Sequence, residues 1–308
     1  MSVANAFQTY GDSTIETDIV RNSVEILSAS VNDIYSKLGK TAAISTVHSY
    51  SVDTLLAAGS QAVQQGADFS YSARTAPSLL TNIVQENAVS LRVTRPAVAV
   101  SRYSGENELS RQTSKALTEF VNAAEFDLIR STLVSGVSGT VAKMSGIIQA
   151  ISKSTNTTAH TSGTVFSATV LDGLMQDNWT NSNGDVATEV FVGGVMKRVT
   201  DNFVAKSNVV VNSGDIRTIV RTVTTYETAF GTVTINKHRY VQQAADATGR
   251  VLAIRPEKLK VAFLEAPTML DNLTVGGAYF PRAIYGSMTL EVRNQDSNWF
   301  SSGFLLSA

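Results

Sequence analysis

The sequence predicts an α+β fold, because its helical and strand-forming segments are separate and do not alternate as βαβ units. Helical periodicity is clearest in two long stretches, residues 20–38 and 106–134. Alternation of apolar and polar residues, typical of half-buried strands, occurs at residues 89–93 and recurs after residue 186. No internal repeat is found. With 308 residues, 43% of them hydrophobic, the chain can bury a sizeable core and form more than one compact unit.

The composition excludes several functional classes. The net charge is −1, from 25 basic and 26 acidic residues that are spread along the chain, so no surface for gripping a phosphate backbone is expected. Cysteine is absent, which removes disulfides, thiolate nucleophiles and sulfur-ligated metals. No apolar run approaches 18 residues and the first residues do not resemble a signal peptide, so we expect a soluble protein without a membrane span.

The first predicted element is an amphipathic helix over residues 20–38. Its apolar residues follow a 4-3-4-3-4 spacing, and Gly39 stands where a C-terminal cap belongs. Such a helix either lies on the core of its own chain or packs against a neighbouring chain. The residues that form this face are Val20, Val24, Leu27, Val31, Ile34 and Leu38.

A long, mostly polar, two-stranded excursion is predicted next, over residues 45–94. Arg95-Pro96 marks its end, because the residue before proline is driven out of helical geometry. The second long helix follows at residues 106–134, with Glu106 and Glu108 in its first turn and Gly136 just beyond its end. At 1.5 Å per residue it spans roughly 40 Å and acts as a rod on which other parts are mounted.

The remaining chain predicts a separate α+β unit. Residues 152–164 are rich in Ser and Thr and are interpreted as a surface linker. A short helix at 170–175, a strand at 187–193, a helix at 195–203 and a hairpin at 224–239 follow, with Glu227 to Gly231 as the turn of the hairpin. Further strands are expected at 250–265, broken by Pro256, and at 286–294.

No catalytic, cofactor or metal site is predicted. Gly39-Lys40-Thr41 resembles the end of a P-loop, but Ile34 stands where that motif requires its first glycine. Gly193-Gly194 lacks the rest of a dinucleotide fingerprint, and the NSNGD turn fails the register of a calcium loop. The three histidines, His48, His160 and His238, are far apart in sequence and have no partner at metal-ligand spacing.

Two pairs of acids, Glu106/Glu108 and Glu125/Asp127, could be taken for general acid–base pairs. Their i,i+2 spacing directs the two members of each pair to different faces of a helix. We interpret them as a solvated face and a helix N-terminus, and we expect no enzymatic activity.

A series of short motifs, in a fixed order, carries a family resemblance. They are D53-T-L, G66-A-D before P77, N82-x-x-Q85 before a V-x-L-x-V strand, E125-F-D in the long helix, G146-I-I-Q-A-I, F191-V-G-G with Lys197, and Y226-E-T-x-F-G-T-V-T-I-N. Together with the order of elements they resemble the major capsid proteins of tailed phages, which have the Hong Kong 97-like fold. More closely, they are similar to a phage capsid family catalogued as a domain of unknown function. The resemblance covers residues 18–305.

The resemblance implies a domain organisation and a function. It implies an N-terminal arm at 1–44, an extended loop at 45–94, a peripheral domain at 95–151 with a spine helix at 106–134, an axial domain at 152–270 and a return segment at 271–308. The implied function is a structural subunit that assembles in the host cytoplasm into pentamers and hexamers of an icosahedral virion shell around double-stranded DNA. Absence of catalytic groups fits a protein whose many weak contacts gain strength by multivalency.

The implied partners are other copies of the chain, portal and scaffolding proteins, a decoration protein, and packaged DNA without sequence-specific contact. Apolar or large exposed side chains of the arm, the extended loop and the hairpin are the expected subunit contacts. These residues are Val20, Val24, Leu27, Val31, Ile34, Phe69, Tyr71, Arg74, Tyr226 and Phe230.

One departure from the resemblance gives a prediction. Some shells of this fold cross-link a lysine of the extended loop to an asparagine of a neighbour, but here no lysine lies between Lys40 and Lys115. We expect a shell without isopeptide bonds between subunits, so mature particles should give no ladder of covalent oligomers on a fully denaturing gel; such a ladder would refute this. Two alternatives stay open: a tail-tube or other non-shell virion protein, and the shell of an encapsulin-like compartment.

Overall fold

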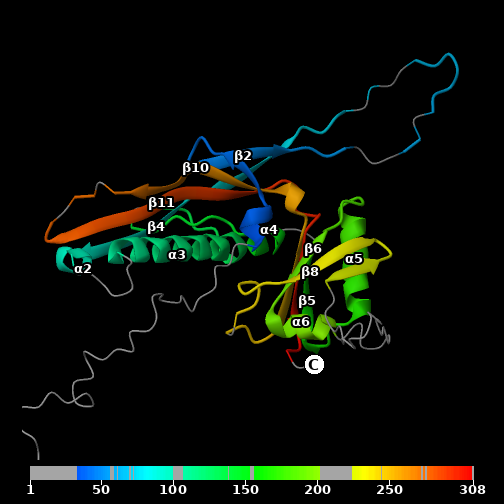
Figure 1. Cartoon of the computed structure of the whole chain (residues 1–308). Coiled ribbons are helices and arrows are strands. Elements are labelled where there is room, and N and C mark those ends of the chain that lie inside the picture. The colour runs from blue at the N-terminus through cyan, green and yellow to red at the C-terminus, as the bar shows by residue number, and fades with distance from the viewer. Residues whose placement is uncertain are drawn as a thin grey trace, which may run out of the picture. The chain divides into compact units, whose positions relative to one another are not determined.

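The computed structural model describes residues 33–55, 59–60, 62–68, 71, 73–99, 107–137, 139–152, 156–201, 224–243, 245–271, 273–274 and 276–306. In these residues helices and strands are mixed, in the order shown in Figure 1. The helices are α1 (Asp33–Lys37), α2 (Arg95–Ala99), α3 (Glu108–Arg130), α4 (Ile147–Ser152), α5 (Ala168–Asn181), α6 (Gly194–Asp201) and the 3₁₀ turn η1 (Pro256–Lys258). The strands are β1 (Gly39–Ala42), β2 (Val47–Val52), β3 (Ser78–Ile83), β4 (Gln85–Thr94), β5 (Thr157–Thr164), β6 (Glu189–Val192), β7 (Thr225–Thr228), β8 (Gly231–Lys237), β9 (Gly249–Ile254), β10 (Leu259–Leu270), β11 (Tyr279–Val292) and β12 (Trp299–Phe304).

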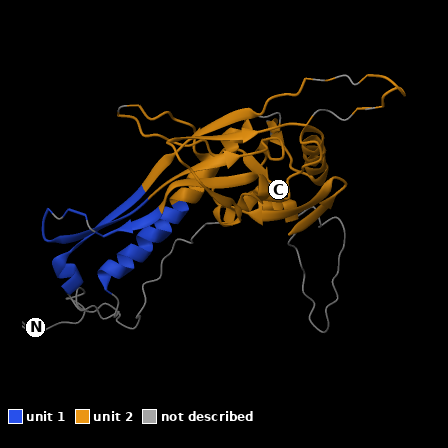
Figure 2. Ribbon diagram, turned by 90° about the horizontal axis from the view of Figure 1, so that it is seen from above, with its two compact units in different colours: residues 1–30, 88–122, 267–285 blue, residues 31–87, 123–266, 286–308 orange. Residues whose placement is uncertain are grey.

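The strands form three sheets. A four-stranded sheet has the order β1-β10-β11-β4, a six-stranded sheet has the order β5-β12-β9-β6-β8-β7, and β2 pairs with β3 alone. In the last pair the strands are antiparallel, with Val47 opposite Ile83 and Val52 opposite Ser78. The chain divides into two compact units, coloured in Figure 2: residues 1–30, 88–122 and 267–285, and residues 31–87, 123–266 and 286–308.

The smaller unit contains the first half of α3. Ala116 and Phe120, one turn apart, are buried against Ile284 of β11, with Val89 and Leu91 of β4 packed beside them. The helix begins where Asn107 accepts a hydrogen bond from the Leu109 N–H at 2.9 Å, as an N-cap residue does. Leu117, although apolar and next to Ala116, is 54% exposed.

The larger unit has two cores. One gathers the end of α3 with α1, α4, β10 and β11 around Leu128, Ile147 and Leu290. The other lies between α5, α6 and the six-stranded sheet, and Trp299 and Phe304 of β12 are buried in it. Strands β6, β9 and β12 therefore contribute side chains to both cores, since alternate side chains of a strand point to opposite faces.

Helix α3 ends at Arg130, four residues before the predicted end. The Ser131 N–H still bonds to the Asp127 carbonyl, and the Gly146 N–H bonds to the Ser131 carbonyl at 2.9 Å. A Cβ at position 146 would lie 2.9 to 3.0 Å from backbone atoms of this last turn. The glycine of the G146-I-I motif therefore allows the returning chain to close off the helix.

The predicted linker at 152–164 is wrong in its second half, because residues 157–164 form strand β5. This strand pairs in parallel with β12, with Phe300 opposite Thr157. Its repeated threonines are β-branched, which suits a strand as well as a loop. The partner strand is about 140 residues away in sequence, so no local pattern signals the pairing.

The predicted hairpin is confirmed with a shorter turn. Thr228 is paired with Gly231, so Glu227 belongs to β7 and only Ala229 and Phe230 form the turn. Gly231 has φ +148°, and the Thr228 hydroxyl donates to its carbonyl at 2.7 Å. The short helix at 170–175 is likewise longer than predicted: α5 runs from Ala168 to Asn181 behind an N-cap at Ser167.

Candidate functional site: the anchors of the arm and the extended loop

A buried carboxylate holds the start of the described chain. Both oxygens of Glu125, in α3, accept backbone N–H groups at the start of α1: Ile34 N at 2.7 Å and Tyr35 N at 2.8 Å. His238, at the end of β8, lies 2.9 Å from the same carboxylate. Glu125 is 0% exposed and His238 is 2% exposed. We call Ile34, Tyr35, Glu125 and His238 the arm anchor.

The tautomer of His238 follows from its neighbours. The Tyr240 N–H donates to Nδ1 at 3.2 Å, so the proton of a neutral ring lies on Nε2 and is donated to Glu125. The ring also meets Phe191 edge-on at 5.8 Å, and Phe191 opens the F191-V-G-G motif. His238 therefore links the end of β8 to α3, through Glu125, and to β6, through Phe191. Neither of its ring nitrogens is free to bind a metal.

A second set of buried polar groups holds the extended loop at its root. Asn82 of β3 donates to the carbonyls of Leu290, at 2.8 Å, and Ser145, at 3.2 Å. Its side-chain oxygen accepts the N–H groups of Ser145 and Ile83, each at 2.9 Å. All the hydrogen-bonding capacity of this amide is used, which fixes β3 on β11 and on the segment after α3.

Gln85, three residues after Asn82, forms a similar set of buried hydrogen bonds. Its amide nitrogen donates to Asp127 at 2.7 Å and to Asn87 at 2.8 Å. Its oxygen accepts the Met144 N–H at 3.2 Å. The motifs N82-x-x-Q85 and E125-F-D, about 40 residues apart in sequence, thus supply polar residues to both anchors, and Ser145, bonded to Asn82, directly precedes the G146-I-I motif.

The facing strand β2 is held in the same way. His48 lies 2.7 Å from the carboxylate of Glu291, and the Tyr50 hydroxyl oxygen accepts the Val292 N–H at 3.2 Å. Burial, opposed by that hydrogen bond and helped by the charge of Glu291, raises the pKa of Tyr50. We call His48, Tyr50, Asn82, Gln85, Asp127 and Glu291 the loop anchor.

Asp127 is the buried carboxylate of the loop anchor that bonds to Gln85. Burial raises its pKa above the usual value, and the hydrogen bond from Gln85 only partly offsets this. A raised pKa in the folded chain means that Asp127 favours folding most at pH values below the unfolded pKa and loses this contribution as pH rises through the folded pKa.

We therefore predict that Asp127→Asn raises the urea midpoint at pH 7, because asparagine can accept the Gln85 hydrogen bond without a buried charge. The advantage should shrink as pH falls through the raised pKa of Asp127. Asp177→Asn, on the exposed surface of α5, is the matched control and should show neither effect. A midpoint difference for Asp127→Asn that is independent of pH would contradict the prediction.

The structure separates the predicted contact residues into four groups. Val20, Val24, Leu27, Val31 and Phe69 lie outside the described residues. Ile34 is 0% exposed in the core of its own chain, so it packs inward and is a correction to the predicted surface set. Tyr71 is 94% exposed and Arg74 is exposed, as are all described residues from 53 to 77.

The two hairpin residues are half-buried. Tyr226 and Phe230 pack against the core between α5, α6 and the six-stranded sheet, and Phe230 lies 6.1 Å from the ring of Trp179. Burial and the neighbouring Asp172 raise the pKa of Tyr226. Trp179 is 50% exposed and extends this aromatic pair to the surface.

Sequence reasoning missed the anchors. Glu125 and Asp127 were expected in solvent, and His48 and His238 were considered only as metal ligands. Among the described residues no group of three acids or histidines could hold a metal ion, and no helix has the length and apolarity to cross a membrane. One feature of the sequence could have indicated the anchors: Glu125 and His48 are polar residues in segments that otherwise consist of apolar or small residues.

Comparison with known proteins gives both a family and a fold. A family model described as SU10 major capsid protein matches residues 5–301. The solved capsid of a native GTA particle is similar at 10% identity and TM-score 0.67, covering 98% of this chain and 100% of that one. The capsid of Myoviridae phage XM1 is similar at 11% identity and TM-score 0.63, covering 98% and 100%.

A third structure of the same fold comes from a different kind of shell. The holo-SrpI encapsulin complex from Synechococcus elongatus PCC 7942 is similar at 9% identity and TM-score 0.60, covering 98% of both chains. No curated protein matches the sequence.

Proposed function

Because this chain belongs to the SU10 major capsid protein family, we propose that its two anchors set the directions of an arm and a loop that join it to neighbouring copies. The chain is a shell-forming structural protein of a tailed-phage virion, and the predicted Hong Kong 97-like fold is confirmed. The observation that carries the proposal is the buried, hydrogen-bonded root of each segment beside the exposure of every described residue between 53 and 77.

The proposed contacts follow from this arrangement. The proposed arm, residues 1–44, would contribute Val20, Val24, Leu27 and Val31 to contacts with a neighbouring copy. The extended loop contributes Phe69, Tyr71 and Arg74, and the hairpin contributes Tyr226 and Phe230 beside Trp179. A segment whose root is already fixed loses less conformational entropy on binding than one that is free along its whole length. The buried roots therefore favour binding of the arm and the loop to neighbouring copies.

The domain organisation is also proposed. Support comes from the two cores: the long helix α3 with the four-stranded sheet suits a peripheral domain, and the six-stranded sheet with α5 and α6 suits an axial domain. Within the return segment at 271–308, β11 belongs to the first sheet and β12 to the second, so we place this segment in both domains, with its first strand peripheral and its last strand axial.

The finer partners remain part of the proposal. We propose that the chain assembles in the host cytoplasm, with portal and scaffolding proteins and with packaged DNA held without sequence-specific contact, and that a decoration protein is a further partner. The near-neutral charge of −1 supports weak contact with DNA. We also propose that the subunit has no enzymatic activity. The family and the fold favour a shell over a tail tube, and the encapsulin likeness concerns the fold alone.

Deletion of residues 1–32 tests the role of the arm. The truncated chain should fold, because Ile34, Leu38 and β1 remain and complete the core, but it should no longer close shells. The deletion stops at residue 32 because a longer one would also remove the buried side chains of Ile34 and Leu38. Circular dichroism checks the fold, and light scattering after gel filtration measures assembly; normal shells from the truncated chain would overturn the proposed role.

A further inference from the structure

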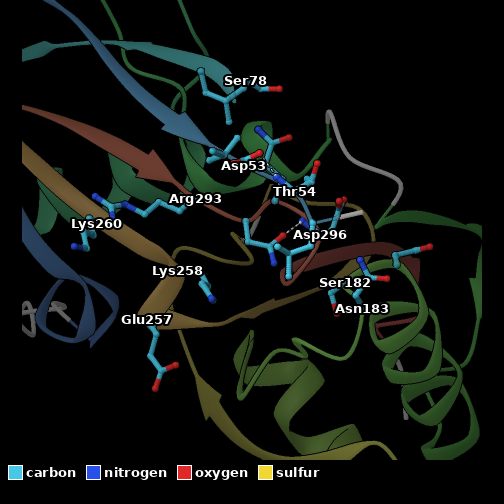
Figure 3. Close-up of a pocket in the computed structure, with 16 residues that line it drawn as sticks. Asp53, Thr54, Ser78, Ser182, Asn183, Glu257, Lys258, Lys260, Arg293 and Asp296 are labelled. Carbon is cyan, nitrogen blue, oxygen red and sulfur yellow. Dashed lines mark hydrogen bonds between the residues drawn. The ribbon is translucent and has the colours of Figure 1, made fainter. Parts of the chain in front are cut away.

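The charged side chains of the larger unit are unevenly distributed, although the net charge of the whole chain is only −1. A polar groove of about 960 Å³ shows the balanced case, because basic and acidic side chains alternate around it (Figure 3). Its charged residues are Asp53, Glu257, Lys258, Lys260, Arg293 and Asp296. Opposite charges that lie so close together largely cancel, so a polyanion gains little in the groove.

One edge of the six-stranded sheet is different. At this edge the parallel strands β6 and β8 end and β9 begins: Val192 lies between Lys237 and Val251 in one row across the sheet. Helix α6 starts two residues after Val192, and the segment that follows β8 passes over this junction, where Gln242 packs against Gly193. We call this region the basic edge. The residues that define it are Arg198, Lys237, Arg239 and Arg250.

Three cations of the basic edge have no acidic partner. Arg198, Lys237 and Arg239 are all exposed, and none of them forms an ion pair with another described residue. The acid of α6, Asp201, pairs with Lys197 at 3.0 Å instead. The three positive charges therefore face solvent without compensation within the described part of the chain.

Arg250 adds to this positive surplus. The carboxylate of Asp246 is shared by two arginines, Arg130 at 2.5 Å and Arg250 at 3.1 Å, so it neutralises only one of them. The Nε of Arg250 is buried and has no hydrogen-bond partner. Burial lowers the pKa of Arg250, and the charge of Arg130 adds to this effect while Asp246 opposes it. A bound anion would favour the charged form of this guanidinium.

The surroundings of these cations select the class of anion. Among the exposed residues of 194–201 and 237–243, Val195 is the only one with an apolar side chain. The core of a protein–protein interface is usually apolar, so an acidic protein surface fits this edge less well than a polyanion. Two strand spacings of about 4.8 Å make the row from β8 to β9 roughly 10 Å wide. B-DNA carries one charge per about 1.7 Å of its axis, so such a row faces several phosphates.

We propose that the basic edge is the surface of each subunit that contacts the phosphate backbone of the packaged double-stranded DNA. This inference rests on the proposed function and names the residues that make the DNA contact. Contacts to phosphates carry no direct sequence information, in keeping with a partner that is bound without regard to sequence. Each subunit contributes only a few cations, so single contacts are weak, and their repetition over the shell gives the sum its strength.

Binding of a short, fluorescently labelled DNA duplex of arbitrary sequence tests the inference. Fluorescence anisotropy measures the affinity of the purified full-length chain over a range of NaCl concentration. Arg198→Gln, Lys237→Gln and Arg239→Gln are combined in one variant, which should bind at low salt about tenfold more weakly or worse. The slope of log affinity against log salt should become shallower by about 1 for each cation removed.

The matched control removes the same charges from the smaller unit. It combines Arg92→Gln, Arg95→Gln and Lys115→Gln, three exposed cations, and should keep the affinity and the salt slope of the wild-type chain. Light scattering establishes that the chains compared have the same state of assembly. If the triple edge variant does not assemble, the single substitutions Arg198→Gln, Lys237→Gln and Arg239→Gln decide, since each should change the slope by about 1.

The outcomes separate this inference from the proposed function. Equal losses of affinity and slope for the two triple variants would show that only total charge matters and would overturn the inference. An edge variant that loses ring formation but binds DNA like the wild-type chain would also overturn it, because the edge would then contact another subunit. A wild-type chain that forms shells but does not bind the duplex would overturn the inference and leave the shell function standing. A wild-type chain that forms neither rings nor shells would overturn the function itself.

Discussion

Replacing Glu125 by alanine is expected to lower the free energy of unfolding by about 3 kcal/mol or more, since each of three buried donors left without an acceptor costs about 1–3 kcal/mol. The carboxylate is 0% exposed and accepts the N–H groups of Ile34 and Tyr35 and the Nε2–H of His238. Alanine leaves all three donors buried without an acceptor. Glu125→Gln should lose less, since its carbonyl oxygen can still accept one of them. Urea denaturation followed by tryptophan fluorescence measures both.

Glu119→Ala is the matched control for this substitution. Glu119 lies on the same helix, its side chain is 54% exposed, and its only recorded ion pair is with Lys115 at 3.7 Å. Exposed pairs of this kind contribute about 0–1 kcal/mol. Similar losses of stability for Glu125→Ala and Glu119→Ala would show that the arm anchor does not hold the chain as described.

Replacing Gly303 by alanine is expected to cost about 3 kcal/mol or more, from backbone strain added to a steric clash. Gly303 in β12 has φ +97°, a conformation that residues with a Cβ rarely adopt. A Cβ there would lie 2.1 Å from the carbonyl oxygen of His160 in β5. The backbone on both sides must move apart, so the pairing of β12 with β5 should be lost locally.

Gly139→Ala separates the two causes. Gly139 has a similar φ, +84°, but nothing lies within 4 Å of the position that its Cβ would take. Its cost should therefore be that of the left-handed conformation alone, about 1–2 kcal/mol. Amide hydrogen exchange should show loss of protection in β5 and β12 for Gly303→Ala only; equal effects of the two substitutions on stability and exchange would contradict the close approach.

The sequence predicts the elements whose signal is local. The helix α3 was expected because Ala116, Phe120, Ala124 and Leu128 recur at helical spacing, and all four are buried. The hairpin β7–β8 was expected from its alternation and its glycine. Helix α3 ends earlier than its apolar pattern because Gly146, from a later segment, packs against its last turn.

What the sequence does not predict depends on distant partners. Strand β5 resembles a Ser/Thr linker until β12 pairs with it. The spacing of Glu125 and Asp127 correctly indicated different faces of α3, but each face meets a buried polar partner, His238 on one side and Gln85 on the other. Neither partner is near in sequence, so an acid expected in solvent is instead an anchor.

The anchors also explain why the family motifs contain polar residues at buried positions. An apolar residue in place of Asn82 or Gln85 could fill the space, but it would not fix one direction for the strand that it holds. Saturated amides specify geometry as well as stability. The same hydrogen bonds make these positions sensitive to substitution: loss of Asn82 leaves four backbone groups without this partner, and loss of Gln85 leaves the Met144 N–H and the Asp127 carboxylate without theirs.

Electron microscopy of the purified full-length chain, over a range of protein concentration and salt, tests the central claim most directly. The account predicts closed shells, or rings of five and six subunits, formed by the chain itself. Long tubes of constant width, at concentrations where rings were expected, would contradict it and favour the tail-tube alternative.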